Sequence, residues 1–168
     1  TIGSVTIAYA TGAGSGNELT SSVATYVGKV TASSPTGGTF TASNYNISYT
    51  AGNIVVIAAN LTITASDVNR TYGGAILSGS AGSVSFTTSG LQNSETIGSV
   101  TIAYATGAGS GNELTSSVAT YVGKVTASLP TGGTFTASNY NISYAAGNIV
   151  VVPANLTITA SDVNRTYG

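Results

Sequence analysis

Asn60-Leu61-Thr62-Ile63-Thr64-Ala65-Ser66 alternates apolar and polar side chains. This period of two is typical of a β-strand with one buried face, so Leu61, Ile63 and Ala65 are expected to point into a core. The same alternation, with the apolar run Ile54–Ile57, predicts further strands. They are Ser4–Ala10, Ala24–Ser33, Asn44–Thr50 and a short one at Val84–Phe86.

Turn-forming residues separate these stretches. Thr50-Ala51-Gly52-Asn53 predicts a hairpin, and Pro35-Thr36-Gly37-Gly38 predicts a second turn. About seven or eight short strands per period favour an all-β fold, a two-layer antiparallel β-sandwich of immunoglobulin-like architecture. The one helix candidate is Asn17–Val23, and if it is helical the alternative is a β-grasp-like repeat with one short helix.

Most of the chain is one unit written twice. Residues 1–73 recur as residues 96–168, an offset of 95. A repeat of this length suits a whole small domain used in tandem. The two copies differ at only four positions: Ser34 and Leu129, Thr50 and Ala145, Ile57 and Val152, Ala58 and Pro153.

The exchange of Ala58 for Pro153 indicates a domain junction, because proline cannot donate to a sheet ladder. If repeats begin directly after this junction, residues 1–58 are the C-terminal part of one repeat and residues 59–153 are one complete repeat. Residues 154–168 are the N-terminal strand and turn of the next repeat. Because the chain starts at Thr1 without a Met or signal sequence, we expect a slice of a longer precursor. Since the slice is out of phase with the repeat, we also expect unpaired strand edges unless a neighbouring chain, or sequence outside the slice, fills them.

The composition argues against several classes of protein. The 168 residues include no Cys and no His, and only 5% are charged. Neither a disulfide framework nor a His- or Cys-based metal site can be built, and four basic residues cannot form a nucleic-acid surface. The 42% apolar content argues against disorder, and no apolar run approaches the length of a membrane span.

The ionisable groups suggest no catalytic constellation. Residues 59–153 hold Asp67, Arg70, Glu95, Glu113 and Lys124. Asp67 is expected to cap its turn and pair locally with Arg70, and the other acids are dispersed. We therefore predict no enzymatic activity, no cofactor and no metal site.

One family resembles this pattern. Ser43–Tyr49, the following turn, Ala59–Ala65 and a closing Tyr72-Gly73 resemble the MBG-type repeat of very large secreted bacterial proteins, many of them filamentous-haemagglutinin-like adhesins. In the second copy, the junction Val152-Pro153-Ala154 is closer still to the family pattern. Val23-Ala24-Thr25-Tyr26 departs from it, with Ala24 where the family has Gly. The resemblance implies an extracellular, bacterial cell-surface location and an extended tandem array, without catalytic residues.

Single residues offer three candidate modifications or binding roles. An intramolecular isopeptide bond would use Lys29 or Lys124, although Lys29 is expected on a solvated strand face. Tyr9, Tyr45 and Tyr49 could stack on sugars, but core packing is the favoured interpretation. Asn-x-Ser/Thr sequons are candidate glycosylation sites, with chance occurrence favoured; they begin at Asn46, Asn60, Asn69, Asn141, Asn155 and Asn164.

These observations predict a structural repeat of a bacterial extracellular filament or adhesin stalk, as in a secreted biofilm component. Its partners are neighbouring copies of itself, in a tandem array or a homopolymer with strands paired between protomers. The alternative is an adhesive module that binds a glycan or surface protein through the loop Thr11–Asn17 and the segment Gly74–Glu95, which occurs once.

Overall fold

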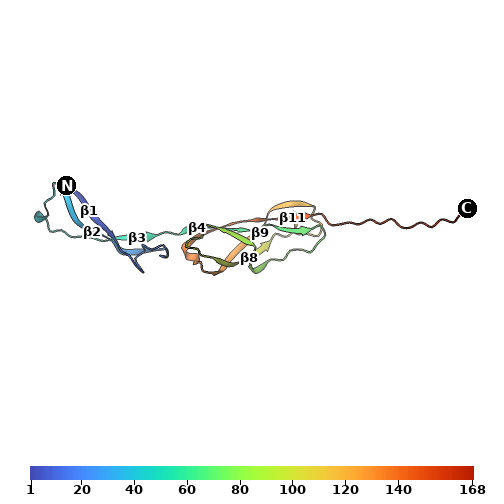
Figure 1. Ribbon diagram of the computed structural model, residues 1–168, viewed down its shortest axis with the longest axis horizontal. Helices are drawn as coiled ribbons and strands as arrows, with labels where there is room; N and C mark the ends of the chain where they lie inside the picture. The colour runs from blue at the N-terminus through green and yellow to red at the C-terminus, as the bar shows by residue number, and fades with distance from the viewer. The chain divides into compact units, whose positions relative to one another are not determined.

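The computed structural model describes residues 1–168, and its regular secondary structure is almost entirely β-strand (Figure 1). All-β is thus confirmed as the fold class. The elements are β1 Ile2–Tyr9, β2 Ala24–Gly38, η1 Ala42–Asn44, β3 Gly52–Val56, β4 Ala59–Ala65, β5 Val68–Thr71, β6 Ser80–Ser83, β7 Phe86–Ser89, β8 Ile97–Tyr104, β9 Ala119–Gly133, η2 Ala137–Asn139, β10 Tyr140–Ala145 and β11 Gly147–Val152, where η marks a 3-10 turn.

The strands form three sheets. Their orders are β1-β2-β3, β10-β4-β7 and β5-β11-β9-β8-β6. The neighbouring strands of the first sheet are antiparallel, whereas β5 runs parallel to β11. This parallel pair departs from the antiparallel arrangement that the sequence predicts.

The chain divides into two compact units. The first consists of Thr1–Thr62, Thr88–Ile97 and Gly132–Ser143, and the second of Ile63–Thr87, Gly98–Thr131 and Tyr144–Gly168. All ten buried apolar side chains lie between residues 61 and 151. The N-terminal strands and the C-terminal end therefore contribute no fully buried apolar side chain.

Alternation along the strands is confirmed where a strand has a covered face. In β4, Leu61, Ile63 and Ala65 are buried, as the period of two predicts, and the residues between them are half-buried. β11 repeats the pattern, with Ile149 and Val151 buried. Branched side chains pack well on such a pleated surface, which explains why Ile, Val and Thr dominate these strands.

The predicted hairpin at Thr50–Asn53 is wrong. Its counterpart in the second copy separates β10 from β11, which belong to different sheets. In the first copy, Asn44–Thr50 does not form a strand at all. The turn therefore carries the chain from one sheet to another instead of pairing two neighbouring strands.

The helix candidate Asn17–Val23 is also wrong, and with it the short helix of the β-grasp-like alternative. These residues form turns and bends. The Ser15 hydroxyl accepts a hydrogen bond from the Asn17 N–H at 3.1 Å, and the Ser21 hydroxyl accepts one from the Glu18 N–H at 3.2 Å. Such side-chain to backbone bonds compete with helix formation.

Candidate functional site

The same strand sequence occurs in two states of burial. Val100 and Ile102 of β8 are 1% and 2% exposed, whereas the matching Val5 and Ile7 of β1 are 44% and 46% exposed. The flanking sequences are identical, so the local sequence does not cause the difference. Burial of this strand depends on chain segments outside it.

The C-terminal residues also differ in burial from their counterparts, but here the later segment is the exposed one. Leu61 and Ile63 of β4 are 0% exposed, whereas the matching Leu156 and Ile158 are 83% and 86% exposed. After β11, residues 153–168 contain no strand, and their red trace in Figure 1 carries no arrow. We call residues 154–168 the tail; their sequence is identical to that of residues 59–73.

In the second copy, the outer edge of β11 is occupied by β5. Val68 is opposite Ile149 and Thr71 is opposite Val152. The Tyr72 N–H continues the ladder by donating to the Val152 carbonyl at 2.9 Å. Residues 59–73 therefore supply both a buried strand and a parallel edge strand.

In the first copy, β3 holds the place of β11 but is the last strand of its sheet. Its outer backbone groups lack the strand that β11 pairs with. We call the exposed apolar side chains of β1, with this unpaired edge of β3, the open face. Unpaired edges of this kind readily accept a strand from another chain.

A buried arginine fastens the residues that follow β5. Arg70 is only 5% exposed, and its guanidinium donates to backbone carbonyls alone. Nη1 bonds the carbonyls of Gly111 and Glu113 at 3.1 and 2.6 Å, and Nη2 bonds that of Gly74 at 2.5 Å. A longer bond of 3.4 Å joins Nε to Ala75. We call this arrangement the arginine clasp.

The predicted local pair of Asp67 and Arg70 is wrong. Asp67 instead accepts hydrogen bonds from Asn148, from its backbone N–H at 2.7 Å and its side-chain amide at 3.2 Å. Asp67 and Arg70 thus each form hydrogen bonds that hold residues 59–73 against segments distant in the sequence. Arg165, the counterpart of Arg70 in the tail, is exposed.

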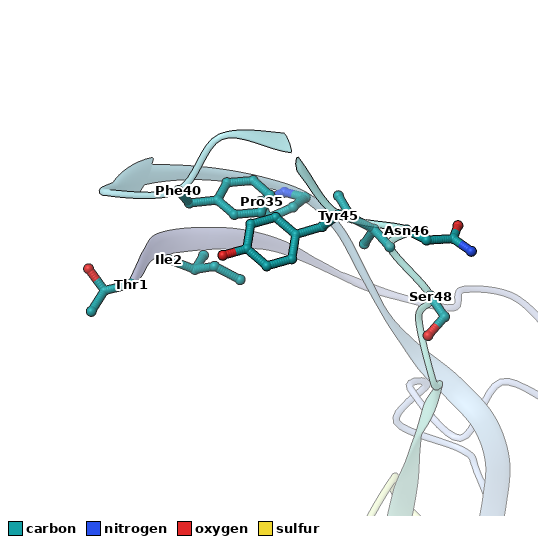
Figure 2. A pocket seen from close by; sticks show the side chains of 8 residues that line it. Thr1, Ile2, Pro35, Phe40, Tyr45, Asn46 and Ser48 are labelled. Atoms are coloured by element: carbon teal, nitrogen blue, oxygen red, sulfur yellow. The ribbon is translucent and has the colours of Figure 1, made fainter. Parts of the chain in front are cut away.

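A pocket of about 360 Å³ lies beside the open face (Figure 2). The rings of Phe40 and Tyr45 stack in it with centroids 5.4 Å apart, and Ile2 lies nearby. The complete lining is Thr1, Ile2, Pro35, Phe40, Tyr45, Asn46, Ile47 and Ser48. Tyr45 is 63% exposed.

The counterpart of Tyr45 in the second copy is covered. Tyr140 is 8% exposed; its hydroxyl donates to the Glu95 carboxylate at 2.6 Å and accepts from the Gln92 N–H at 3.0 Å. Burial raises the pKa of Tyr140, and the bond to Glu95 raises it further. The pocket around Tyr45 therefore matches the place that residues 92–95 help to cover in the second copy.

The core interpretation is wrong for all three tyrosines of the first copy. Tyr9, Tyr45 and Tyr49 are 60%, 63% and 51% exposed, so none of them is a core residue. Their counterparts include the buried Tyr140 and the 47% exposed Tyr144. The alternation selects the correct face but does not determine whether another segment covers it.

The candidate modification sites lie on the surface or near it. Lys29 and Lys124 occupy equivalent places on β2 and β9 and are half-buried. The isopeptide bond stays a prediction, as does glycosylation. Every sequon asparagine is exposed: Asn46, Asn60, Asn69, Asn141, Asn155 and Asn164.

The expected junction residues lie outside strands. Ala58 stands between β3 and β4, and Pro153 directly follows β11. The loop Thr11–Asn17 contains a buried Ser15. Asn112, the counterpart of Asn17, is buried and bonds both backbone groups of Leu77, at 2.7 and 3.0 Å. This part of the proposed adhesive loop thus has a packing role in the second copy.

The sequence analysis did not identify the role of Gly147, which lets the start of β11 pass close to the backbone of Ala65 and Ser66. A Cβ added to Gly147 would lie 2.5 and 2.6 Å from the carbonyl oxygens of Ala65 and Ser66, whereas at the matching Gly52 the nearest atom is the Cβ of Val30, at 3.5 Å. The signal was present, because Gly recurs at the start of an otherwise β-branched run.

No helix of the chain has both the length and the apolar character needed to cross a membrane. The structure contains no group of three or more acidic, His or Cys side chains placed to hold a metal ion. The chain matches no protein family, no curated protein and no solved structure.

Proposed function

We propose that this chain is a structural repeat of a bacterial extracellular filament or adhesin stalk, in which copies are joined by strand pairing. The observation that carries the proposal is the contrast between the two copies. The same sequence is buried at Val100 and Ile102 and open at Val5 and Ile7. A unit whose apolar face is closed only by segments from outside it is suited to assembly with its neighbours.

The tandem β-sandwich is part of the same proposal. Residues 59–152 contribute eight strands to two sheets, and β4 and β11 each have one buried face. Two sheets with one apolar face each bury those faces most simply by packing on one another. Repeats of this kind, linked end to end by short connections, would make an extended stalk.

The low charge supports this role. Only 5% of the residues are charged and the net charge is −1, so neighbouring repeats would not repel one another strongly. The absence of Cys prevents unwanted disulfides between extracellular copies. The extracellular, bacterial-surface location rests on the resemblance to MBG-type repeats.

Electron microscopy and sedimentation of the purified chain test the proposal. We expect concentration-dependent oligomers that appear as beaded rods or fibres. A chain that sediments as a monomer at all concentrations up to the millimolar range contradicts the strand-paired filament.

A second candidate is an adhesive module for a glycan. The observation that favours it is the pocket beside Phe40 and Tyr45, because stacked, exposed aromatic rings can bind sugar faces. We rank it second, since the matching Tyr140 is covered by the chain itself. Saturable binding of the chain to a glycan array, lost on Tyr45→Ala, would favour this function instead.

A further inference from the structure

We infer that the tail of one copy of this chain binds the open face of a second copy, with Arg165 as its anchoring residue. The inference rests on the proposed function, since it names the segment, the register and the anchor of the strand pairing. The second copy of the repeat serves as the template. There, residues with the identical sequence, 59–73, occupy the corresponding positions.

Both partners of the proposed contact are exposed in the single chain. In the tail, Leu156 and Ile158 are 83% and 86% exposed, and on the open face Val5 and Ile7 are 44% and 46% exposed. Their counterparts in the template are at most 2% exposed. Pairing the tail with the open face would remove both sets of apolar side chains from water.

The template gives the register. Val68 is opposite Ile149, so Val163 of the tail would be opposite Ile54 of the other copy, in a parallel pair. The following pairs would be Asn164 with Val55, Arg165 with Val56 and Thr166 with Ile57. A slip by one residue would turn Arg165 to the opposite face of the strand, since its counterpart Arg70 is the buried residue of β5, which disfavours other registers.

Arg165 would reach two of the acceptors of the arginine clasp in the other copy. Arg70 bonds the carbonyls of Gly111 and Glu113, whose first-copy counterparts are Gly16 and Glu18. Gly16 already has the left-handed φ of 77°, matching 76° at Gly111, so the loop is formed before the arginine arrives. A preformed set of acceptors reduces the entropic cost of binding.

Gly52 leaves room for the incoming strand. A Cβ at Gly147 would collide with carbonyl oxygens of Ala65 and Ser66, and the matching oxygens in the tail belong to Ala160 and Ser161. In the single chain, a Cβ added to Gly52 would meet nothing closer than the Val30 side chain, at an ordinary van der Waals distance. Gly52→Ala should therefore spare the fold and block the tail.

Sedimentation equilibrium of the 168-residue chain tests the donor side. Leu156→Asp should weaken association by about 100-fold or more, because the template buries this position completely and an unpaired buried charge is costly. Asn155→Asp, the matched control, adds the same charge at the neighbouring residue, whose template counterpart Asn60 is exposed, and should change association less than about threefold. Equal effects of the two variants overturn the inference.

The acceptor side has its own pair of variants. Gly52→Ala should weaken association as strongly as Leu156→Asp, while Thr50→Ala, which reproduces the residue found at position 145, should have little effect. Circular dichroism of each variant checks that the fold is retained. Association that survives Gly52→Ala overturns the inference.

Disulfide trapping tests the register, because the chain has no Cys of its own. A size-tagged Ile54→Cys chain is mixed with an untagged Val163→Cys chain, and Asn164→Cys replaces the latter in the control. We expect the 54–163 disulfide to form at least about tenfold faster, since neighbouring residues in a strand face opposite sides. Equal rates contradict the register.

The outcomes separate this inference from the proposed function. If the chain forms fibres but Leu156→Asp and Gly52→Ala do not affect them, the filament stands and the tail is not the connecting segment. If the chain remains a monomer, both fail. A monomer whose own tail cross-links at position 54 also overturns exchange between copies.

Discussion

Ile7→Ala and Ile102→Ala make the same chemical change in the same local sequence. Truncating a buried isoleucine costs about 2–5 kcal/mol, part of it from the cavity left behind. Ile102 is 2% exposed, so we expect a loss of about 3–4 kcal/mol in the free energy of unfolding. Ile7 is 46% exposed, and its truncation leaves an open surface instead of a cavity. We expect about 1 kcal/mol there.

Urea unfolding followed by circular dichroism measures the two losses. Both variants are made in the Leu156→Asp background, so that association does not cover the open face. Ala8→Ser and Ala103→Ser are the matched controls, since both alanines are exposed, and their effects should be equal and small. Equal losses for Ile7→Ala and Ile102→Ala would refute the claim that identical sequences differ in burial.

Three further predictions follow from the arginine clasp, the buried Tyr140 and the left-handed backbone of Leu129 in β9. Arg70→Ala should lower the free energy of unfolding by about 2–4 kcal/mol because buried carbonyls lose their donors, whereas the exposed Arg165→Ala should change it by less than about 0.5 kcal/mol in urea titrations at low concentration. Since burial, with the hydrogen bond to Glu95, raises the Tyr140 pKa above the usual 10.0, its contribution to stability is complete below pH 10.0 and is lost as the pH rises through the raised value. Tyr140→Phe should remove that alkaline step from a plot of unfolding midpoint against pH, and a persisting step would assign it to another group. Leu129 has a φ of 47°, which a branched side chain adopts at a cost, so Leu129→Asn should raise stability by about 1 kcal/mol, seen as a higher melting temperature.

The all-β fold and the inward faces of the best-covered strands could be predicted from the sequence. The alternation of Leu61 and Ile63 is a local property of the chain, and it matches their burial. Asn44–Thr50 shows the limit of this reasoning. The same pattern forms β10 in the second copy and no strand in the first, because a strand also needs a partner to pair with.

The arginine clasp could not be predicted by the same means. Its acceptors at Gly111 and Glu113 lie 41 and 43 residues from Arg70, and backbone carbonyls carry no sequence signature. Asp67 is the nearest acidic residue in the sequence, and for that reason the sequence predicts a local pair with it. Only the path of the loop that follows β8 brings these carbonyls to the guanidinium.

The most direct test of the account uses a synthetic peptide with the sequence of residues 154–168. It is titrated into the Leu156→Asp chain, and binding is followed by calorimetry and by amide hydrogen exchange at β3. If the tail binds the open face, binding saturates at one peptide per chain and the amides of Gly52–Val56 become protected from exchange. Adding Gly52→Ala to the chain abolishes the binding. A peptide that does not bind, or that binds without protecting β3, would contradict the account.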